Sequence, residues 1–258
     1  MNQRITILYF SPTGTTEKVL TAIAKGIDAP FEVINLTHLQ ARQQFQTTAF
    51  EKNDIVIVGA PVYSGRIPAL FLETIADIKG IDANIVPVVV YGNRDYDDAL
   101  LELKDFFEAR GFTTLAAGAF IGEHSFTASV AGGRPDRNDL ETAHQFGQTI
   151  AANIAAFQKR PLSVKGNDPY RQNPPAAPMA PETNETCNAC GICAENCPVE
   201  AIDFKDYSIV DSTKCIRCCS CIKKCPQDAK AFTQAPIKAV QQKLIDNFSI
   251  RREPELFL

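Results

Sequence analysis

The chain has 258 residues, of which 45% are hydrophobic and 22% are charged, and its formal net charge is -4. This is globular composition, and no apolar run approaches the roughly 20 residues that a helix needs to cross a bilayer. The net negative charge argues against nucleic acid as a partner.

The first 157 residues alternate short apolar runs with segments of helical periodicity, which predicts βαβ units and a parallel sheet. The N-terminus enters the first run at once and lacks the pattern of a secretory signal, so we expect a cytoplasmic location. Two of the runs are continuously apolar, as in strands that helices cover on both faces. The predicted strands are Ile5–Phe10, Phe31–Leu36, Asp54–Ala60, Ile85–Tyr91 and Phe112–Ile121. The predicted helices are Thr16–Lys25, Leu39–Phe50, Pro68–Ile78, Asp97–Arg110 and Asp136–Phe157.

The composition changes at residue 158, where prolines recur and apolar periodicity disappears. We predict an α/β domain over 1–157, a proline-rich linker over 158–186, a cysteine-rich domain over 187–233, and an amphipathic helix with a tail over 234–258. The linker is either a passive spacer or a stiff segment that holds two domains apart. Within the last segment, one helical face carries Ile237, Val240, Leu244 and Phe248.

All nine cysteines lie between Cys187 and Cys225, and eight of them form two copies of C-x2-C-x2-C-x3-C-P. In this spacing the fourth cysteine of each copy ligates the other 4Fe-4S cluster. We therefore predict that cluster one is held by Cys187, Cys190, Cys193 and Cys225, and cluster two by Cys215, Cys218, Cys221 and Cys197. Zinc and disulfides are the alternatives, and two tetrads that each end in Cys-Pro argue against both. Cys219 falls opposite Gly191 of the first copy and is not predicted to be a ligand.

The segment Ser11–Thr16 follows the first predicted strand and opens the first helix. Hydroxyl and N–H groups at a helix N-terminus form an anion site, and the absence of a Walker lysine favours a monoester phosphate over a nucleoside triphosphate. The same residue types also cap ordinary helices, so this signal is weak alone.

Two loops after the third and fourth strands strengthen it, because ligands of doubly wound sheets bind at the carboxyl ends of the strands. Tyr63 stands beside Gly65 in the first loop, and Tyr96 follows Gly92 in the second. Two aromatic rings could flank an isoalloxazine ring, and glycine lets backbone groups approach its polar edge. We therefore predict a flavin site at this edge.

The chain resembles the flavodoxin/ferredoxin fusion proteins of the ferrodoxin type in LYFSPTGTT, GAPVYSGRIP, YGNRDYDDAL, FIGEHSF, GRPD and both cysteine tetrads. The resemblance implies a five-stranded, doubly wound parallel sheet in the flavodoxin-like order 2-1-3-4-5, a small α+β two-cluster ferredoxin domain, and FMN as the flavin. No tryptophan is present, so Tyr63 or an apolar neighbour must replace the tryptophan that often flanks the flavin. The implied FMN contacts are Ser11, Thr13, Gly14, Thr15, Thr16, Pro61, Val62, Tyr63, Ser64, Gly65, Gly92, Asn93 and Tyr96.

These cofactors predict electron transfer between redox partner proteins, a low-potential donor and an acceptor, and the oxygen sensitivity of such clusters favours an anaerobic setting. One alternative is an FMN-dependent reductase that its own ferredoxin module feeds, with substrate bound near His124. Another is a docking module whose flavodoxin half no longer holds flavin. His124 itself either donates a proton or orders its loop. The sequence leaves these alternatives open.

Overall fold

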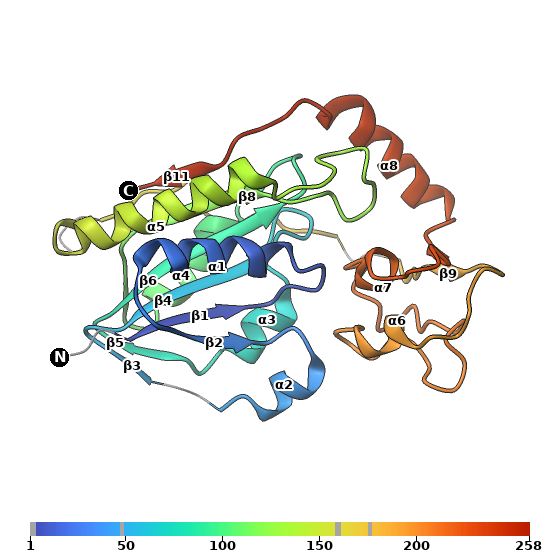
Figure 1. The fold of residues 1–258 in the computed structure, drawn as a ribbon, viewed down its shortest axis with the longest axis horizontal. Coiled ribbons are helices and arrows are strands. Elements are labelled where there is room, and N and C mark those ends of the chain that lie inside the picture. Colours follow the sequence, from blue (N-terminus) through green and yellow to red (C-terminus); the bar gives the residue numbers. More distant parts are fainter. Residues whose placement is uncertain (1–3, 47–48, 158–160, 175–176) are drawn as a thin grey trace.

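A computed structural model of the chain describes residues 4–46, 49–157, 161–174 and 177–258. The N-terminal half builds an α/β layer structure, and the cysteine-rich half lies beside the carboxyl ends of its strands (Figure 1). Among the described residues, no helix is long and apolar enough to cross a membrane.

The central sheet has the strand order β11-β8-β6-β4-β1-β2, and β7 pairs with β6 as its seventh strand. All pairings are parallel except that of β11 with β8. The predicted order 2-1-3-4-5 is confirmed, with the fifth predicted strand divided into β7 and β8. The strands are β1 (Ile5–Tyr9), β2 (Phe31–Asn35), β4 (Ile55–Pro61), β6 (Ala83–Tyr91), β7 (Phe112–Thr114), β8 (Ala117–Ile121) and β11 (Glu255–Phe257).

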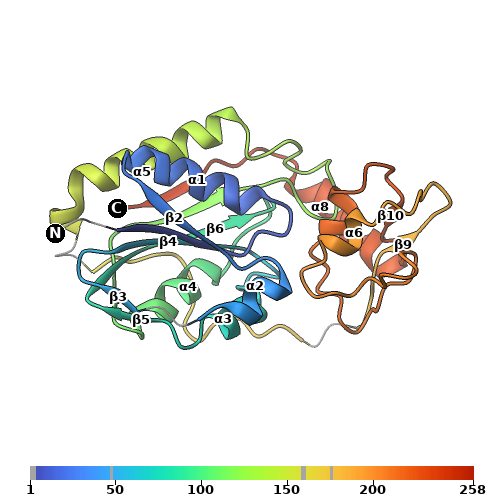
Figure 2. The ribbon, with the colours of Figure 1, turned by 60° about the horizontal axis from the view of Figure 1, so that its bottom comes forward.

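Helices cover both faces of the sheet, as Figure 2 shows. Side chains alternate along each strand, so Ile57 packs in the core beneath α1 and α5 while Val58 packs in the core beneath α3 and α4. Burial on both faces explains why the central strands are continuously apolar. The helices of this half are α1 (Thr15–Ile27), α2 (Leu39–Gln44), α3 (Ala69–Thr74), α4 (Ala99–Glu108) and α5 (Arg137–Phe157).

Helices α1 and α5 cross at two glycines. A Cβ atom on Gly147 would lie 2.1 Å from the carbonyl oxygen of Ile23, and one on Gly26 would lie 1.9 Å from that of His144. Both neighbours are backbone atoms, which cannot move aside as a flexible side chain would. The two glycines therefore permit the close approach of these helices.

Two helices are shorter than predicted. The predicted helix Leu39–Phe50 stops at Gln44, and β3 (Ala49–Glu51) pairs instead with β5 (Lys79–Ile81) in a small parallel sheet. Phe50 is buried, its ring 6.0 Å from that of Phe112, so tertiary packing decides this segment. The predicted helix Pro68–Ile78 ends at Thr74.

The cysteine-rich half is built from two matching copies. Each copy has a cysteine loop followed by a four-residue helix, α6 (Ile192–Glu195) or α7 (Ser220–Lys223). The short strands β9 (Glu182–Thr183) and β10 (Lys230–Ala231) pair antiparallel. Three pairs of equivalent residues share positive φ angles, namely Ala189 with Arg217, Gly191 with Cys219, and Glu200 with Asp228.

The C-terminal segment returns to the N-terminal half. Helix α8 (Ala235–Phe248) confirms the predicted amphipathic helix, and after it the tail crosses to the sheet edge (Figure 1). There β11 pairs with β8, with Glu255 opposite Ala119. This strand was not predicted, because three residues carry no periodicity that a sequence can reveal.

Part of the predicted linker lies against the N-terminal half. The Lys165 ammonium pairs with Asp95 at 2.9 Å, Asn167 N–H donates to Asp98 at 2.8 Å, and the Tyr170 hydroxyl donates to Asp105 at 2.7 Å. Leu162 packs on the sheet core. These contacts favour a held segment over a passive spacer for 161–174, whereas 158–160 and 175–176 lie outside the described residues.

Candidate functional site

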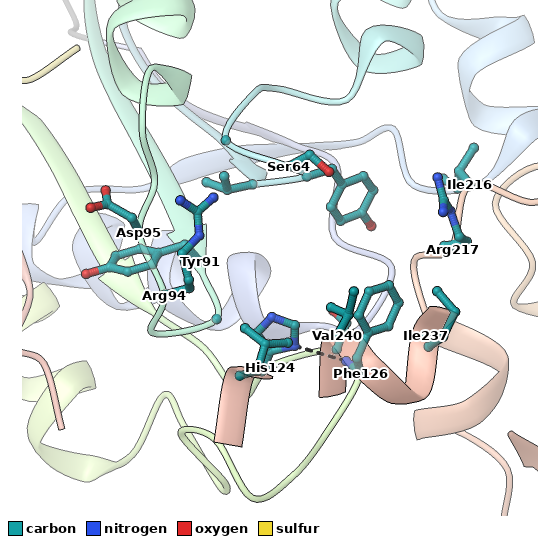
Figure 3. Close-up of a pocket in the computed structure, with 16 residues that line it drawn as sticks. Ser64, Tyr91, Arg94, Asp95, His124, Phe126, Ile216, Arg217, Ile237 and Val240 are labelled. Atoms are coloured by element: carbon teal, nitrogen blue, oxygen red, sulfur yellow. Dashed lines mark hydrogen bonds between the residues drawn. The ribbon is translucent and has the colours of Figure 1, made fainter. Parts of the chain in front are cut away.

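Strands β4, β6 and β8 are parallel, so the loops after them meet at one edge of the sheet. A cavity of about 370 Å³ lies at this edge, and three parts of the chain line it. The sheet loops contribute Val62, Tyr63, Ser64, Gly65, Gly92 and His124. The second cysteine loop contributes Ile216 and Arg217, and α8 contributes Ile237, Val240 and Leu244. In Figure 3, Tyr91, Arg94 and Asp95 occupy the side opposite Ile216 and Arg217.

The first sheet loop brings most of the predicted ring contacts to the cavity. The Tyr63 backbone N–H donates to the Arg66 carbonyl oxygen at 2.9 Å, and the Arg66 backbone N–H donates to the Tyr63 carbonyl oxygen at 3.1 Å. This pair of hydrogen bonds makes a tight turn. Gly65 has φ +82° in this turn, and a Cβ there would lie 2.2 Å from Asp97 Oδ2. Burial, followed by the negative charge that the neighbouring cysteines carry as thiolates, holds the pKa of Tyr63 well above its usual value. The phenol is therefore neutral at physiological pH.

Two predicted ring contacts of the second sheet loop, Asn93 and Tyr96, have partners in the C-terminal tail. The Asn93 amide donates to the carbonyl oxygens of Phe248 and Ile250 at 2.6 and 2.8 Å, and does not line the cavity. The Tyr96 hydroxyl donates to Glu255 at 2.7 Å, and its ring packs 5.4 Å from that of Tyr91. Both side chains hold the C-terminal tail, because the loop turns them away from the cavity. The side chains of Asn93 and Tyr96 are thus engaged by the tail, and their contacts with a flavin ring stay predictions.

Pro61 likewise does not line the cavity. It is the last residue of β4, where it pairs in register with Val90 of the neighbouring strand. Its position belongs to the sheet, and the loop proper begins at Val62, so the contact of Pro61 with a flavin stays a prediction.

His124 points into the cavity (Figure 3). The Phe126 backbone N–H donates to His124 Nδ1 at 3.1 Å, so in the neutral ring the proton sits on Nε2. Burial, and then the positive charges of Lys223 and Arg94, lower the pKa of His124 to about 4. At physiological pH the ring is a neutral hydrogen-bond donor. A Cβ on Gly92 would lie 2.5 Å from this ring, so glycine leaves it room.

The predicted phosphate turn lies at the same sheet edge but does not line the cavity. Gly14 precedes α1 with φ +79°, and the Ser11 backbone N–H donates to Thr37 Oγ1 at 2.9 Å. The Thr13 and Thr15 hydroxyls lie 3.3 Å apart. Thr16 Oγ1 is buried and has no hydrogen-bond partner within the described parts of the chain. Since buried hydroxyls are almost always paired, a phosphate oxygen would fit this turn.

The cysteines gather as the spacing predicts. One cavity is lined by Cys187, Cys190, Cys193 and Cys225, and a second by Cys197, Cys215, Cys218 and Cys221. All are free thiols. The Ala201 and Ala229 backbone N–H groups donate to the sulfur atoms of Cys197 and Cys225 at 3.2 and 3.3 Å, as matching copies should. Within the described residues, no three or more His, Cys, Asp or Glu side chains are grouped so that they could hold a single metal ion. The four predicted ligands at each cavity match the ligand number of a 4Fe-4S cluster, and the second cavity is also bordered by Cys219.

Cys219 is a core residue that also borders the second cavity. It is buried against Phe232 and Ile237, and its thiol donates to the Arg217 carbonyl oxygen at 3.6 Å. Like Gly191, it precedes a four-residue helix in the left-handed conformation. Burial holds the pKa of its thiol well above the usual value. That Cys219 is not a ligand stays a prediction.

Ile216 and Arg217 line both the cavity of about 370 Å³ and the second cysteine cavity. These two residues, together with the three from α8, are functional candidates that sequence reasoning missed. One signal existed: Arg217 stands where the first copy has Ala189, so the two cysteine loops differ in charge at this position.

Specific contacts join the two halves around the cavity. Lys223 forms an ion pair with Glu123, and the Ser220 hydroxyl donates to the Pro12 carbonyl oxygen at 2.8 Å. The Phe126 and Phe232 rings meet edge-on at 5.6 Å. The cysteine-rich half is therefore docked on both the phosphate turn and the loop of His124.

Two family models match the chain: the flavodoxin domain over residues 6–122 and the 4Fe-4S binding domain over residues 183–203. The protein therefore combines an N-terminal flavodoxin domain with a C-terminal 4Fe-4S binding domain. This confirms its resemblance to the flavodoxin/ferredoxin fusion proteins. No curated protein matches the chain.

Solved structures are similar to part of the chain at low identity. A flavodoxin from the domain Archaea is 16% identical, over 59% of this chain and 99% of that one, with a TM-score of 0.40. The two-electron reduced flavodoxin of Megasphaera elsdenii is 15% identical, over 56% and 98%, with a TM-score of 0.39. Rubredoxin oxygen:oxidoreductase of Desulfovibrio gigas is 19% identical, over 62% of this chain and 38% of that one, with a TM-score of 0.40.

Proposed function

We propose that the protein relays electrons between redox partner proteins through one FMN and two 4Fe-4S clusters, in the order FMN, cluster two, cluster one. We call the cavity of about 370 Å³ the flavin cavity, and the cavity lined by Cys197, Cys215, Cys218 and Cys221 the cluster-two cavity. Ile216 and Arg217 carry this proposal, because their loop lines both cavities and separates one from the other. We further propose that the protein works in the cytoplasm, with domain boundaries at 1–157, 158–186, 187–233 and 234–258.

The chain offers distinct groups to each part of the FMN. The hydroxyls of the phosphate turn and the N-terminus of α1 would hold the phosphate, with Thr16 Oγ1 as the buried donor. Tyr63 would flank the ring, and His124 Nε2 would donate a hydrogen bond to a ring acceptor. When bound, the flavin supplies a centre that accepts one or two electrons, whereas each cluster passes one.

The cysteine burial supports exchange with partners at cluster one. Cys190 of cluster one is exposed, whereas Cys218 of cluster two is buried. A partner protein that docks near Cys190 would then reach the flavin only through both clusters.

The apolar side chains that line the cavity favour a relay over a reductase. Ile216, Val240 and Leu244 line the cavity on the side of the cysteine-rich half and α8. A substrate of a flavin reductase would need room beside the ring, and here apolar side chains of the same chain take that place.

Cofactor analysis of anaerobically purified protein tests the proposal. We expect about eight iron, eight sulfide and one FMN per chain. The change Cys218→Ser should remove cluster two, whereas Cys219→Gly, which copies Gly191, should keep all the iron. Thr16→Val should weaken FMN binding without loss of iron. A purified wild-type protein that neither contains FMN nor binds added FMN would refute the relay.

A further inference from the structure

The two cysteine loops have the same backbone but different side chains at one position. Ala189 has φ +56° and Arg217 has φ +57°, each between the first and second cysteines of its copy. A left-handed conformation disfavours every residue except glycine, so neither side chain is selected by the backbone. Because alanine serves in the first loop, holding a cluster does not require the arginine side chain. Its role must come from its surroundings.

Those surroundings differ between the copies. The first loop is not among the parts of the chain that line the flavin cavity, whereas Arg217 stands in its wall. Figure 3 shows Arg217 across the cavity from Tyr91 and Asp95. The same residue also lines the cluster-two cavity, between the ligands Cys215 and Cys218. Arg217 therefore places its charge between the two proposed redox centres.

The neighbouring cations are already neutralised. Arg94 forms an ion pair with Asp97, and Lys223 forms one with Glu123. Among the described residues, the Arg217 guanidinium forms no ion pair with a carboxylate and no side-chain hydrogen bond, and its charge acts on the neighbouring Cys215. A partly buried cation that no carboxylate neutralises attracts anionic groups, which on one side are the cysteines of cluster two and on the other would be an anionic group in the cavity.

We propose that Arg217 is a flavin-site residue whose charge favours the reduced, anionic isoalloxazine ring. This inference rests on the proposed FMN site. Two electrons, delivered singly by a reduced partner protein through the clusters, and one proton from water leave the ring with one net negative charge. The guanidinium attracts that charge, so Arg217 raises the flavin reduction potential relative to a neutral residue.

Substitutions at both equivalent positions test this. Arg217→Gln should bind oxidised FMN within about twofold of wild type but reduced FMN about tenfold more weakly. For a two-electron couple, a tenfold difference corresponds to a flavin potential about 30 mV lower. Arg217→Lys should retain most of the wild-type potential. The matched control Ala189→Arg, which adds the charge to the other loop, should leave the flavin potential unchanged.

The measurement is an anaerobic redox titration followed by flavin absorbance, with FMN dissociation constants from fluorescence and iron counted in parallel. If wild type binds FMN and Arg217→Gln has the wild-type potential, the inference fails while the FMN site stands. If wild type binds no FMN, both fail. If Arg217→Gln loses iron, Arg217→Ala replaces it, since alanine is the residue that the first loop carries. An equal shift in Ala189→Arg would also overturn the inference, because the effect would then not depend on position.

Discussion

The two halves of the molecule are stabilised in different ways. In the flavodoxin domain, extensive apolar cores lie on both faces of the sheet, beneath α1 and α5 on one side and α3 and α4 on the other. In the cysteine-rich half, the small core clusters include the cysteines themselves, such as Cys193 beside Ala194 and Ile202. A domain with so little apolar burial depends on its metal centres. The comparison teaches that one half folds around apolar side chains, whereas we expect the other to fold around bound iron-sulfur clusters.

Removal of the clusters should have the largest effect. Treatment with acid and chelator should unfold 187–233, because the cysteines would then surround empty cavities, while the flavodoxin domain keeps its structure. Hydrogen exchange read by mass spectrometry should show lost protection in 187–233 and retained protection in β4 and β6. Persistent protection of 187–233 without iron would contradict the comparison.

Gly147→Ala tests the flavodoxin domain, which its apolar cores stabilise. The new Cβ would lie 2.1 Å from the Ile23 carbonyl oxygen, so α1 and α5 must separate. Overpacking of this kind costs about 3 kcal/mol, which should lower the Tm by about 6–12 °C for a chain of this size. Iron content should not change. The control Gln148→Ala, at an exposed neighbour on α5, should leave the Tm near that of wild type.

Asn93→Ala tests the junction between the halves. Buried Asn93 donates to Phe248 and Ile250 and accepts from the Arg252 N–H at 3.2 Å, so its loss leaves tail groups unpaired. We expect a cost of about 2 kcal/mol. Faster hydrogen exchange in α8 and faster FMN release should accompany it. Unchanged exchange in α8 would show that the tail is held by β11 alone.

His124 should produce the smallest effect, a pH dependence. Its pKa of about 4 in the folded protein lies below its ordinary value of 6.5, so the unfolded chain binds the proton more readily. Stability from this group is therefore complete above pH 6.5 and falls as the pH drops toward 4. At pH 5 the loss should be about 1 kcal/mol after screening. In His124→Gln, urea denaturation at pH 5 and pH 7 should show a difference smaller by that amount.

Much of the fold was predictable from local patterns. The apolar runs at Ile55–Pro61 and Ala83–Tyr91 predict buried parallel strands because both faces are covered. The spacing of the cysteines predicts which four thiols share each cavity, since three ligands come from one tight loop. Segments with little periodicity were mispredicted. Phe50 lies in a short strand, not in the predicted helix, because its ring packs against that of Phe112.

The sequence by itself determined the central strands, the two cysteine tetrads and the loops at the carboxyl ends of the strands, since each depends on periodicity or spacing along the chain, whereas the sheet order followed from the resemblance to flavodoxin/ferredoxin fusion proteins. Only the tertiary structure decided that Asn93 and Tyr96 hold the tail, that β11 joins the sheet, and that Arg217 stands between two cavities. These facts depend on how the halves dock. Contacts between residues more than a hundred positions apart leave no periodic signal in either segment.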